Sequence, residues 1–519
     1  MKRTLTRVLS LFLAVLCAAA VLSPAASAAE YYENDLPVVY VIGRGTWIYD
    51  KNENKIYPTD GIEKAIKNNV NNLATAWIKS LISPNSDWNE LSDAIYKLVE
   101  EEYKNYVLDD NGEISNGTHA KPNAEPKAKK SNFSITDYQF SYDGRIDPRE
   151  NAKLLNEYIN KVLTVTGKRK VQLIGRCLGS TVISAYLTMY GCSKVDTAIF
   201  YAASNQGIVP LSAFFTGDVI FDCKAIEKYG DGYLKNSASD GSDNLSRSLV
   251  TLGYKLSKSF YLTDYVIENV EKAYRDIART LYPRIVLAVY GTCPGFWTMV
   301  RDDYYEKAKQ VVFEGKAKYA KLIEKIDWYH YNVFQKFPQT LKKCKQQGGM
   351  KVAVIAKYNI QLAPLFKDCM KQADNLVELE TASYGATCAD IKQLLPDSYI
   401  NAQEKAGKGK YISPDLKVDA STCLFPDYTW FIKDLPHDVF PNSVNELIMK
   451  IFHSKEQFTV DSDEQFSQYL QYESNSLLLS KVTELDLADE NDSAEISLRK
   501  LLNLFNTLFW LLKNLLNIM

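Results

Sequence analysis

The chain has 519 residues, of which 46% are hydrophobic and 24% are charged, and its formal net charge is −2. These proportions are ordinary for a globular protein, and a charge so near zero gives no reason to expect a nucleic acid as a partner. The chain has four histidines, none of them close to a cysteine in the sequence, and no Cys-x-x-Cys motif. A zinc cluster is therefore not expected, and no other metal or cofactor is predicted.

The N-terminus has the three regions of a secretory signal peptide. Residues 1–7 carry the positive charges, residues 9–21 are apolar, and residues 26–28 form a small Ala-Ser-Ala cleavage site. We expect cleavage after Ala28 and therefore exclude residues 1–28 from the fold. The mature chain is predicted to be secreted, and either free outside the cell or associated with the envelope.

Downstream of this segment, short β-branched runs alternate with amphipathic stretches. Such alternation is typical of a doubly wound, mostly parallel sheet with helices on both faces. In chain order we expect a strand beginning the stretch 36–50, helices at 61–82 and 88–106, an exposed loop at 109–131, a strand at 135–145, a helix at 148–165, a strand at 171–175, a helix at 180–190 and a strand at 195–203.

From about residue 217 to residue 349 the pattern changes to long amphipathic stretches without strands. This pattern predicts a mainly helical insertion, and such an insertion commonly covers the C-terminal edge of a sheet, where open α/β sheets bind ligands. The predicted helices of the insertion lie at 245–257, 264–281, 303–312 and 319–345.

A strand at 350–359 then resumes the sheet, and strand-like segments follow at 376–380 and 428–432. The predicted organisation is therefore a sheet core of residues 29–216 and 350–455, a helical cap of residues 217–349 and a C-terminal extension of residues 456–519.

The last residues of that extension, 498–519, have one polar and one apolar helical face. Their longest apolar run, 508–512, is too short to span a bilayer. We expect the apolar face either to dock on the protein itself or on a second copy, or to lie on a membrane surface.

The stretch VQLIGRCLGS, residues 171–180, places Cys177 between two glycines, after a predicted strand and before a predicted helix. Strand, Gly-x-nucleophile-x-Gly and helix are the parts of the nucleophile elbow of the α/β-hydrolases. Gly175 and Gly179 stand where a Cβ would clash with a neighbouring strand or helix. The turn would present the sulfur at a helix N-terminus, where the backbone dipole favours a thiolate. A buried structural thiol is the alternative.

A triad built on Cys177 needs an acid and then a histidine later in the chain. His119 precedes the elbow, whereas His330 and His453 fall in predicted helices. His437 follows the last strand-like segment in a loop, so we predict that it is the base. The alternative for such a histidine is a solvated loop side chain.

The acid should follow the strand at 350–359. Asp374 lies between that strand and the next apolar run and is the preferred candidate, with Asp419 second and Asp427 third. A turn-forming role is the alternative for each of these aspartates.

An oxyanion hole takes two backbone N–H groups. The first is expected from Leu178, the residue after the nucleophile. The second is expected from Arg44, because Gly43 and Gly45 on either side of it allow the backbone to approach a substrate closely. An ordinary tight turn is the alternative for this early loop.

Three further stretches resemble the lipase and lecithin:cholesterol acyltransferase-like branch of the α/β-hydrolases. They are FSYDGRIDPRENAKLLNEYINKV before the elbow, CPGFWTMVRDDYY in the cap and QADNLVE around Asp374. Two departures stand out: the elbow of that branch is usually Gly-His-Ser-x-Gly, and its early loop usually has His-Gly or Pro-Gly where this chain has Ile42-Gly43. A cysteine elbow is similar to those of dienelactone hydrolases and polyhydroxyalkanoate synthases. The resemblance covers about residues 36–450 and implies an α/β-hydrolase fold with a cap.

A sulfur nucleophile restricts the substrate. Thiolate is a better leaving group than alkoxide, so the tetrahedral intermediate returns to substrate unless His437 protonates the alkoxide promptly. We therefore expect a covalent acyl-enzyme and activated esters, thioesters or lactones as substrates, or transfer of the acyl group to an acceptor. The alternative is a catalytically idle hydrolase-fold module that binds a partner in the cell envelope.

Two finer expectations concern the cap and the cysteines. A bridge between Cys388 and Cys423 would brace the loops that hold the acid and the histidine. Aromatic residues of the insertion are expected to line a cleft for an apolar or lipid acyl group, unless they form the core of the cap itself. They are Phe260, Tyr261, Tyr265, Tyr274, Phe296, Trp297, Tyr304 and Tyr305.

Overall fold

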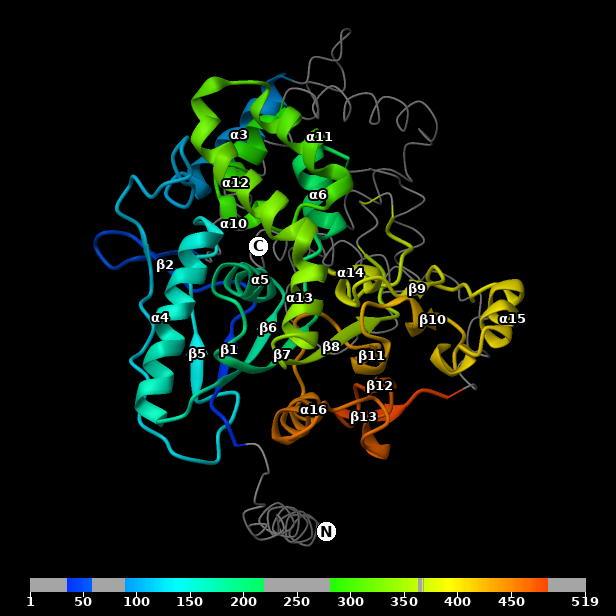
Figure 1. Cartoon of the computed structure of the whole chain (residues 1–519). Coiled ribbons are helices and arrows are strands. Elements are labelled where there is room, and N and C mark those ends of the chain that lie inside the picture. The colour runs from blue at the N-terminus through cyan, green and yellow to red at the C-terminus, as the bar shows by residue number, and fades with distance from the viewer. Residues whose placement is uncertain (1–34, 58–88, 219–280, 363–365, 367, 484–519) are drawn as a thin grey trace, which may run out of the picture.

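The computed structural model describes residues 35–57, 89–218, 281–362, 366 and 368–483. The predicted signal peptide, the helix expected at 61–82, most of the insertion between 219 and 280, and the amphipathic stretch 498–519 lie outside the described residues. The described part is an α/β fold with a mostly parallel central sheet and helices on both of its faces (Figure 1).

The central sheet has eight strands in the order β13-β12-β11-β8-β7-β6-β1-β5, and every neighbouring pair is parallel except β12 and β13. Because β1 lies between β5 and β6, the winding of the chain reverses beside β1. Ligands of doubly wound sheets bind outside the carboxyl ends of the strands at such a reversal. The strands are β1 (Val38–Val41), β5 (Tyr138–Phe140), β6 (Val171–Arg176), β7 (Val195–Tyr201), β8 (Lys351–Tyr358), β11 (Thr429–Lys433), β12 (Tyr469–Glu473) and β13 (Leu478–Lys481).

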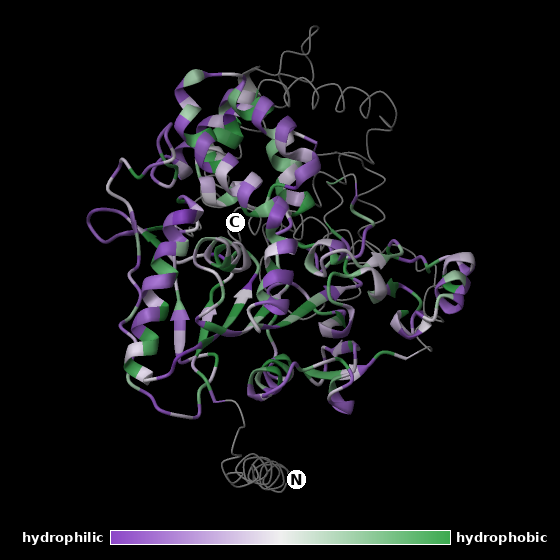
Figure 2. Cartoon of the chain, in the orientation of Figure 1, coloured by the Kyte–Doolittle hydropathy of each residue, from purple (hydrophilic) through white to green (hydrophobic). Residues whose placement is uncertain are grey.

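Side chains alternate between two hydrophobic layers along these strands, as the pleat of a β-strand requires. Val39 and Val41 belong to one layer and Val38 to the other, and Leu173 and Ile174 divide in the same way. Figure 2 shows the hydrophobic residues concentrated along the central strands. The first layer is covered by α4 (Pro148–Thr166), α5 (Gly179–Tyr190), α6 (Val209–Thr216) and α13 (Phe337–Gln346), and the second by α16 (Asn442–His453).

Apart from α13, the described helices of the insertion gather beyond the C-terminal ends of the strands, together with α3 (Figure 1). Backbone hydrogen bonds join them to the core, from Gly295 to the Arg145 carbonyl at 3.1 Å and from Ile208 to the Met299 carbonyl at 2.8 Å. The stretch predicted as one at 319–345 is divided into two helices. The helices of this region are α3 (Asn89–Tyr103), a π-helical turn η1 (Leu287–Gly291), α10 (Pro294–Trp297), α11 (Asp302–Phe313) and α12 (Ala320–Asn332).

The predicted elements around the elbow are confirmed, since β6 and α5 occupy the expected strand and helix. The strand predicted at 376–380 is wrong. A turn at Asn375, whose φ is +77°, leads there into the short helix α14 (Leu379–Ala382). The Asp374 side chain accepts the N–H groups of Leu376 and Val377, which cannot then pair in a sheet.

The sheet also continues past residue 455, where the sequence analysis placed its boundary. Strand β12 pairs with β11, and β13 closes this edge. Among the described helices, none combines the length and the apolar character needed to cross a bilayer. The smaller elements are β2 (Ile48–Tyr49), β3 (Lys55–Tyr57), β4 (His119–Ala120), β9 (Thr387–Cys388), β10 (Val418–Asp419) and α15 (Asp397–Lys405).

Candidate active site

Cys177 lies in the tight turn between β6 and α5. Its φ is +47°, in the left-handed region that L residues rarely adopt, and its side chain is 3% exposed. A Cβ on Gly179 would lie 2.4 Å from the Val41 carbonyl oxygen, and one on Gly175 would lie 2.8 Å from Ile183 Cδ1. The two glycines therefore let the helix approach its own strand and the neighbouring β1, with the sulfur at the C-terminal edge of the sheet.

The histidine and the preferred acid are in contact. His437 Nδ1 lies 2.7 Å from Asp374 Oδ2, and both side chains are buried. The His437 N–H also donates to the Asp374 carbonyl at 2.9 Å. Because Asp374 Oδ1 accepts from Leu376 at 3.2 Å and from Val377 at 2.8 Å, the carboxylate is fixed in place and orients the imidazole.

Electrostatic interactions join the cysteine to this pair. Burial raises the pKa of Cys177, but the charge of His437, a hydrogen bond with its side chain and the charge of Arg176 together lower that pKa below its ordinary value. Burial lowers the pKa of His437, yet Asp374 and Cys177 raise it to about 9. The opposite shifts favour a thiolate beside an imidazolium, with the carboxylate behind it.

Two basic side chains, buried Lys357 and half-buried Arg176, hold the loop that carries the histidine. Lys357 Nζ, on β8, donates to the carbonyls of Pro436 at 2.9 Å, His437 at 3.0 Å and Val439 at 3.3 Å. Arg176 Nη2 donates to the His437 carbonyl at 2.9 Å. Burial lowers the pKa of Lys357 to about 7. The three carbonyl groups around its Nζ can accept all three protons of an ammonium group and so favour the charged form. In the sequence, Lys357 is a single charge near the end of the apolar stretch 350–359, a pattern that does not by itself indicate a role at the site.

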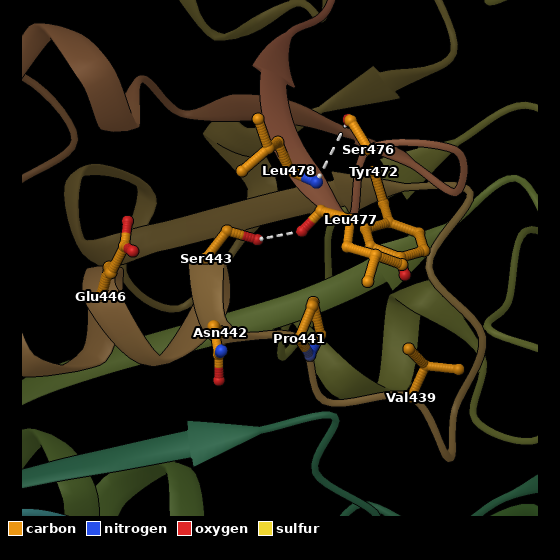
Figure 3. A pocket seen from close by; sticks show the side chains of 9 residues that line it. All are labelled: Val439, Pro441, Asn442, Ser443, Glu446, Tyr472, Ser476, Leu477 and Leu478. Atoms are coloured by element: carbon orange, nitrogen blue, oxygen red, sulfur yellow. Dashed lines mark hydrogen bonds between the residues drawn. The ribbon is translucent and has the colours of Figure 1, made fainter. Parts of the chain in front are cut away.

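A cavity of about 410 Å³ borders the same loop at Val439 and Pro441 (Figure 3). Tyr472 and Leu477 also line it, and the Ser443 hydroxyl donates across it to the Leu477 carbonyl at 3.1 Å. Because none of the triad candidates lines this cavity, it is separate from the candidate site.

The two segments expected to form the oxyanion hole adjoin each other. The Leu178 N–H donates to the Gly43 carbonyl at 3.0 Å, so this predicted donor is already hydrogen-bonded. Arg44 follows in the loop and is exposed. Gly45 has a φ of +77°, and a Cβ there would lie 2.8 Å from the Tyr142 carbonyl oxygen. The structure thus brings the predicted loop to the elbow but leaves the Leu178 donor bonded within the protein.

The other histidines lie apart from the elbow. His119 Nε2 is 3.3 Å from a carboxylate oxygen of Glu53 in the small sheet β2-β3-β4. His330, in α12, bonds to Asp302 at 2.9 Å. His453 is the last residue of α16.

The alternative acids serve local turns. Asp419 accepts from the Ser421 N–H at 2.7 Å and from the Tyr399 hydroxyl at 2.8 Å. Asp427 accepts from the Tyr411 hydroxyl at 2.7 Å. Among the three aspartates, the structure therefore pairs only Asp374 with His437.

The predicted bridge between Cys388 and Cys423 is wrong, because both side chains are free thiols. The Cys423 thiol is instead hydrogen-bonded to Ser383. A different pair of thiols, those of Cys192 and Cys344, are in contact.

The described aromatic rings of the insertion pack on one another. The centroid of the Trp297 ring lies 4.5 Å from that of Phe215 and 5.2 Å from that of Phe313, and the Phe296 ring lies 4.3 Å from that of Tyr290. Phe296 and Trp297 are buried. These rings form part of the core under the cap, which was the alternative to an aromatic cleft, and the four aromatic residues at 260–274 lie outside the described residues.

No protein-family model matches this chain, and no curated protein has a matching sequence. A solved structure with some likeness is the crystal structure of the Tle4-Tli4 complex, with 12% identity over 49% of this chain and 72% of that chain and a TM-score of 0.17. So slight a likeness carries no argument about the site.

Proposed function

We propose that this chain is a hydrolase or acyltransferase that forms a covalent acyl thioester on Cys177. The observation that carries the proposal is the series of contacts from Asp374 through His437 to Cys177 at the C-terminal edge of the sheet. The carboxylate orients the imidazole and the imidazole favours the thiolate, which are the relations that nucleophilic catalysis needs.

In the proposed reaction, Cys177 Sγ attacks the carbonyl carbon of the substrate, and the π electrons of the carbonyl move to its oxygen. The intermediate collapses when the bond to the leaving group breaks and the leaving group takes a proton from His437. Water or another acceptor then attacks the acyl thioester, with His437 as the base, and releases Cys177.

The proposed substrates are activated esters, thioesters or lactones. The tetrahedral intermediate formed by a thiolate expels the thiolate and returns to substrate, unless the leaving group departs easily or is protonated quickly. The pKa of about 9 at His437 supports the second route, because the imidazolium is present at neutral pH to protonate an alkoxide.

The same proposal assigns the chain to the α/β-hydrolase superfamily, in its lipase and lecithin:cholesterol acyltransferase-like branch. The strand order with β1 between β5 and β6, the Gly-x-Cys-x-Gly turn after β6, and an acid that precedes the histidine all support the assignment. The composition of residues 1–28 supports export of the enzyme, where its substrate would be a small-molecule or lipid acyl compound.

The idle binding module remains a second candidate because of two observations. Cys177 is only 3% exposed, and the Leu178 N–H is bonded to the Gly43 carbonyl rather than directed to a substrate. A protein of this kind would keep the elbow as a structural turn and would not turn over acyl compounds.

The test is turnover of p-nitrophenyl esters, lactones and acyl thioesters by the purified protein and its Cys177→Ala and Cys177→Ser variants. We expect Cys177→Ala to lower kcat/KM by about a thousandfold or more, because the nucleophile is lost. Equal turnover by wild type and Cys177→Ala would contradict the proposal.

Labelling with iodoacetamide gives a second readout on the same protein. We expect rapid labelling of Cys177 and slow labelling of Cys293, which is fully buried and whose pKa burial raises to about 12. Slow labelling of Cys177, together with no turnover of any substrate, would favour the binding module.

A further inference from the structure

The hydroxyl of Tyr142 is buried without a partner beside the elbow. The side chain is 2% exposed, and its oxygen has no hydrogen bond among the described residues. Most buried hydroxyl groups are hydrogen-bonded, so an unpartnered one calls for an explanation. One such explanation is that the hydroxyl donates its hydrogen bond only when a substrate is bound.

Three neighbouring strands place this hydroxyl close to the nucleophile. In the sheet order β5-β1-β6, Val41 is in register with Phe140 on one side and with Gly175 on the other (Figure 1). Tyr142 and Cys177 each follow these partners by two residues, so their backbones lie two strand spacings apart, or about 10 Å.

The side chains of Tyr142 and Cys177 belong to the same hydrophobic cluster on one face of the sheet. The Tyr142 ring stacks on Phe140 at 6.1 Å, which fixes it to that face. The turn after Tyr142 also reaches the elbow, because a Cβ on Gly144 would lie 3.2 Å from Leu178 Cδ2. The phenol therefore lies on the same face of the sheet as the sulfur, and its pKa responds to the charge of Cys177.

The usual backbone donor at this position is occupied. The Leu178 N–H gives its hydrogen bond to the Gly43 carbonyl at 3.0 Å. An oxyanion in a buried site needs donors that are already directed at it. The Tyr142 hydroxyl is a neutral donor of that kind: the Gly45 N–H lies near its oxygen, but its own proton has no acceptor among the described residues.

We propose that Tyr142 is a catalytic residue whose hydroxyl donates a hydrogen bond to the oxyanion formed when Cys177 attacks an acyl carbonyl. This inference rests on the proposed function. As the bond between Sγ and the carbonyl carbon forms, the π electrons move to the oxygen, and Tyr142 donates to it without transferring its proton. When the bond to the leaving group breaks, the carbonyl reforms and the hydroxyl is released.

The environment suits a donor that keeps its proton. Burial and the nearby charge of Cys177 raise the pKa of Tyr142 well above its usual value, and the Gly45 N–H opposes that shift only in part. A phenol in that state remains neutral and donates a hydrogen bond, whereas an ionised one would repel both the thiolate and the oxyanion.

The experiment compares Tyr142→Phe with Tyr138→Phe in the full-length protein. Tyr138 is the matched control, because it lies at the other end of β5 and its hydroxyl bonds to the Lys127 carbonyl. With a p-nitrophenyl ester, we expect kcat to fall about a hundredfold in Tyr142→Phe with little change in KM, as for loss of one oxyanion donor. The control should keep the kcat of the wild type.

Two further measurements separate catalysis from structure. A trifluoromethyl ketone forms a tetrahedral oxyanion adduct with a thiolate, so its inhibition constant should rise in Tyr142→Phe by a factor similar to the loss in kcat. Iodoacetamide forms no oxyanion, so its labelling rate at Cys177 should stay unchanged.

The outcomes distinguish this inference from the proposed function. If Cys177→Ala abolishes turnover while Tyr142→Phe keeps kcat within about threefold, the role of Tyr142 is overturned and the triad stands. If Cys177→Ala is fully active, both proposals fail. A parallel fall in kcat, labelling rate and thermal stability in Tyr142→Phe would show a structural role and overturn the inference.

Discussion

The ionisation of Cys177 depends on the balance between burial and one neighbouring ring. Burial alone would keep the thiol protonated, and the charge and hydrogen bond of His437 reverse that tendency. The geometry of His437 depends in turn on Asp374, 2.7 Å from its Nδ1. A small change at any of these three side chains should therefore be visible as a change in the reactivity of one sulfur.

This balance predicts the pH dependence of alkylation at Cys177. The thiolate is present above the lowered pKa of Cys177, so iodoacetamide should react below the ordinary thiol pKa of about 8.5. In His437→Gln, the thiol keeps its burial and loses its cation, so the rate at pH 6 should fall about tenfold or more and recover only at high pH. The His119→Gln variant is the control, because His119 lies in the small sheet β2-β3-β4, away from the elbow, and a profile unchanged in His437→Gln would refute the pairing.

The pH dependence of turnover has a second limb. In the proposed reaction, the leaving group takes its proton from the imidazolium, which is lost as the pH rises through the pKa of His437, about 9. We expect turnover of an alkyl ester to fall above that pH. Since thioesters need less help from an acid, their turnover should fall less, and equal losses would contradict the assigned role of His437.

Among the elements, the turn from β6 to α5 depends most strictly on its residue types, because its two glycines allow the helix to pack closely on the strands. Gly175 and Gly179 are required because backbone and side-chain atoms lie within 3 Å of where a Cβ would be. The two glycines and the strained Cys177 between them are local features, so the sequence could identify this element without knowledge of the sheet. The strand predicted at 376–380 is absent, because the Asp374 side chain accepts the N–H groups that would otherwise bond to a neighbouring strand.

Substituting Gly179 should show how strictly this packing is required. A Cβ at Gly179 would meet the Val41 carbonyl at 2.4 Å, so Gly179→Ala should lower the free energy of unfolding by about 2 kcal/mol or more. Gly409→Ala is the control, because the first atom its Cβ would meet belongs to the flexible Glu404 side chain, at 3.2 Å. Equal denaturant midpoints for the two variants would show that α5 moves away from β1 at little cost.

In the whole molecule, a buried arginine joins segments that are distant in the sequence. Arg145 is fully buried and pairs with Asp143 at 2.7 Å. Its Nη1 also donates to the Tyr106 carbonyl at 2.7 Å and to the Thr118 hydroxyl at 3.1 Å. The chain after α3 is thereby tied to the turn beside the elbow, and the Arg145 carbonyl accepts from Gly295 of the insertion.

Loss of this arginine should destabilise the whole fold. Arg145→Met leaves a buried carboxylate and a buried carbonyl without their partner, so we expect a loss of about 3–5 kcal/mol in the free energy of unfolding. Arg284→Met is the control, because that side chain and its partner Asp93 are 46% and 57% exposed, and their ion pair is expected to contribute about 1 kcal/mol or less. Thermal unfolding compares them, and similar losses would mean that Arg145 does not hold these segments together.

The sequence by itself determined the alternation of strands and helices, the tight turn that carries Cys177, and the chain order of Asp374 and His437. These features depend on local periodicity, on glycines in one tight turn and on the small number of histidines. For the same reason the sequence could rank Asp374 above Asp419 and Asp427 but could not choose among them by contact.

Only the tertiary structure decided which side chains from distant segments meet. It paired Asp374 with His437, directed Lys357 and Arg176 to the carbonyl of that histidine, and buried the Tyr142 hydroxyl near the elbow with no acceptor for its proton in the described part of the chain. Strand order and register bring these residues together across the sheet. Strand order and register depend on the free energy of packing the whole chain, and no short stretch of sequence contains that information.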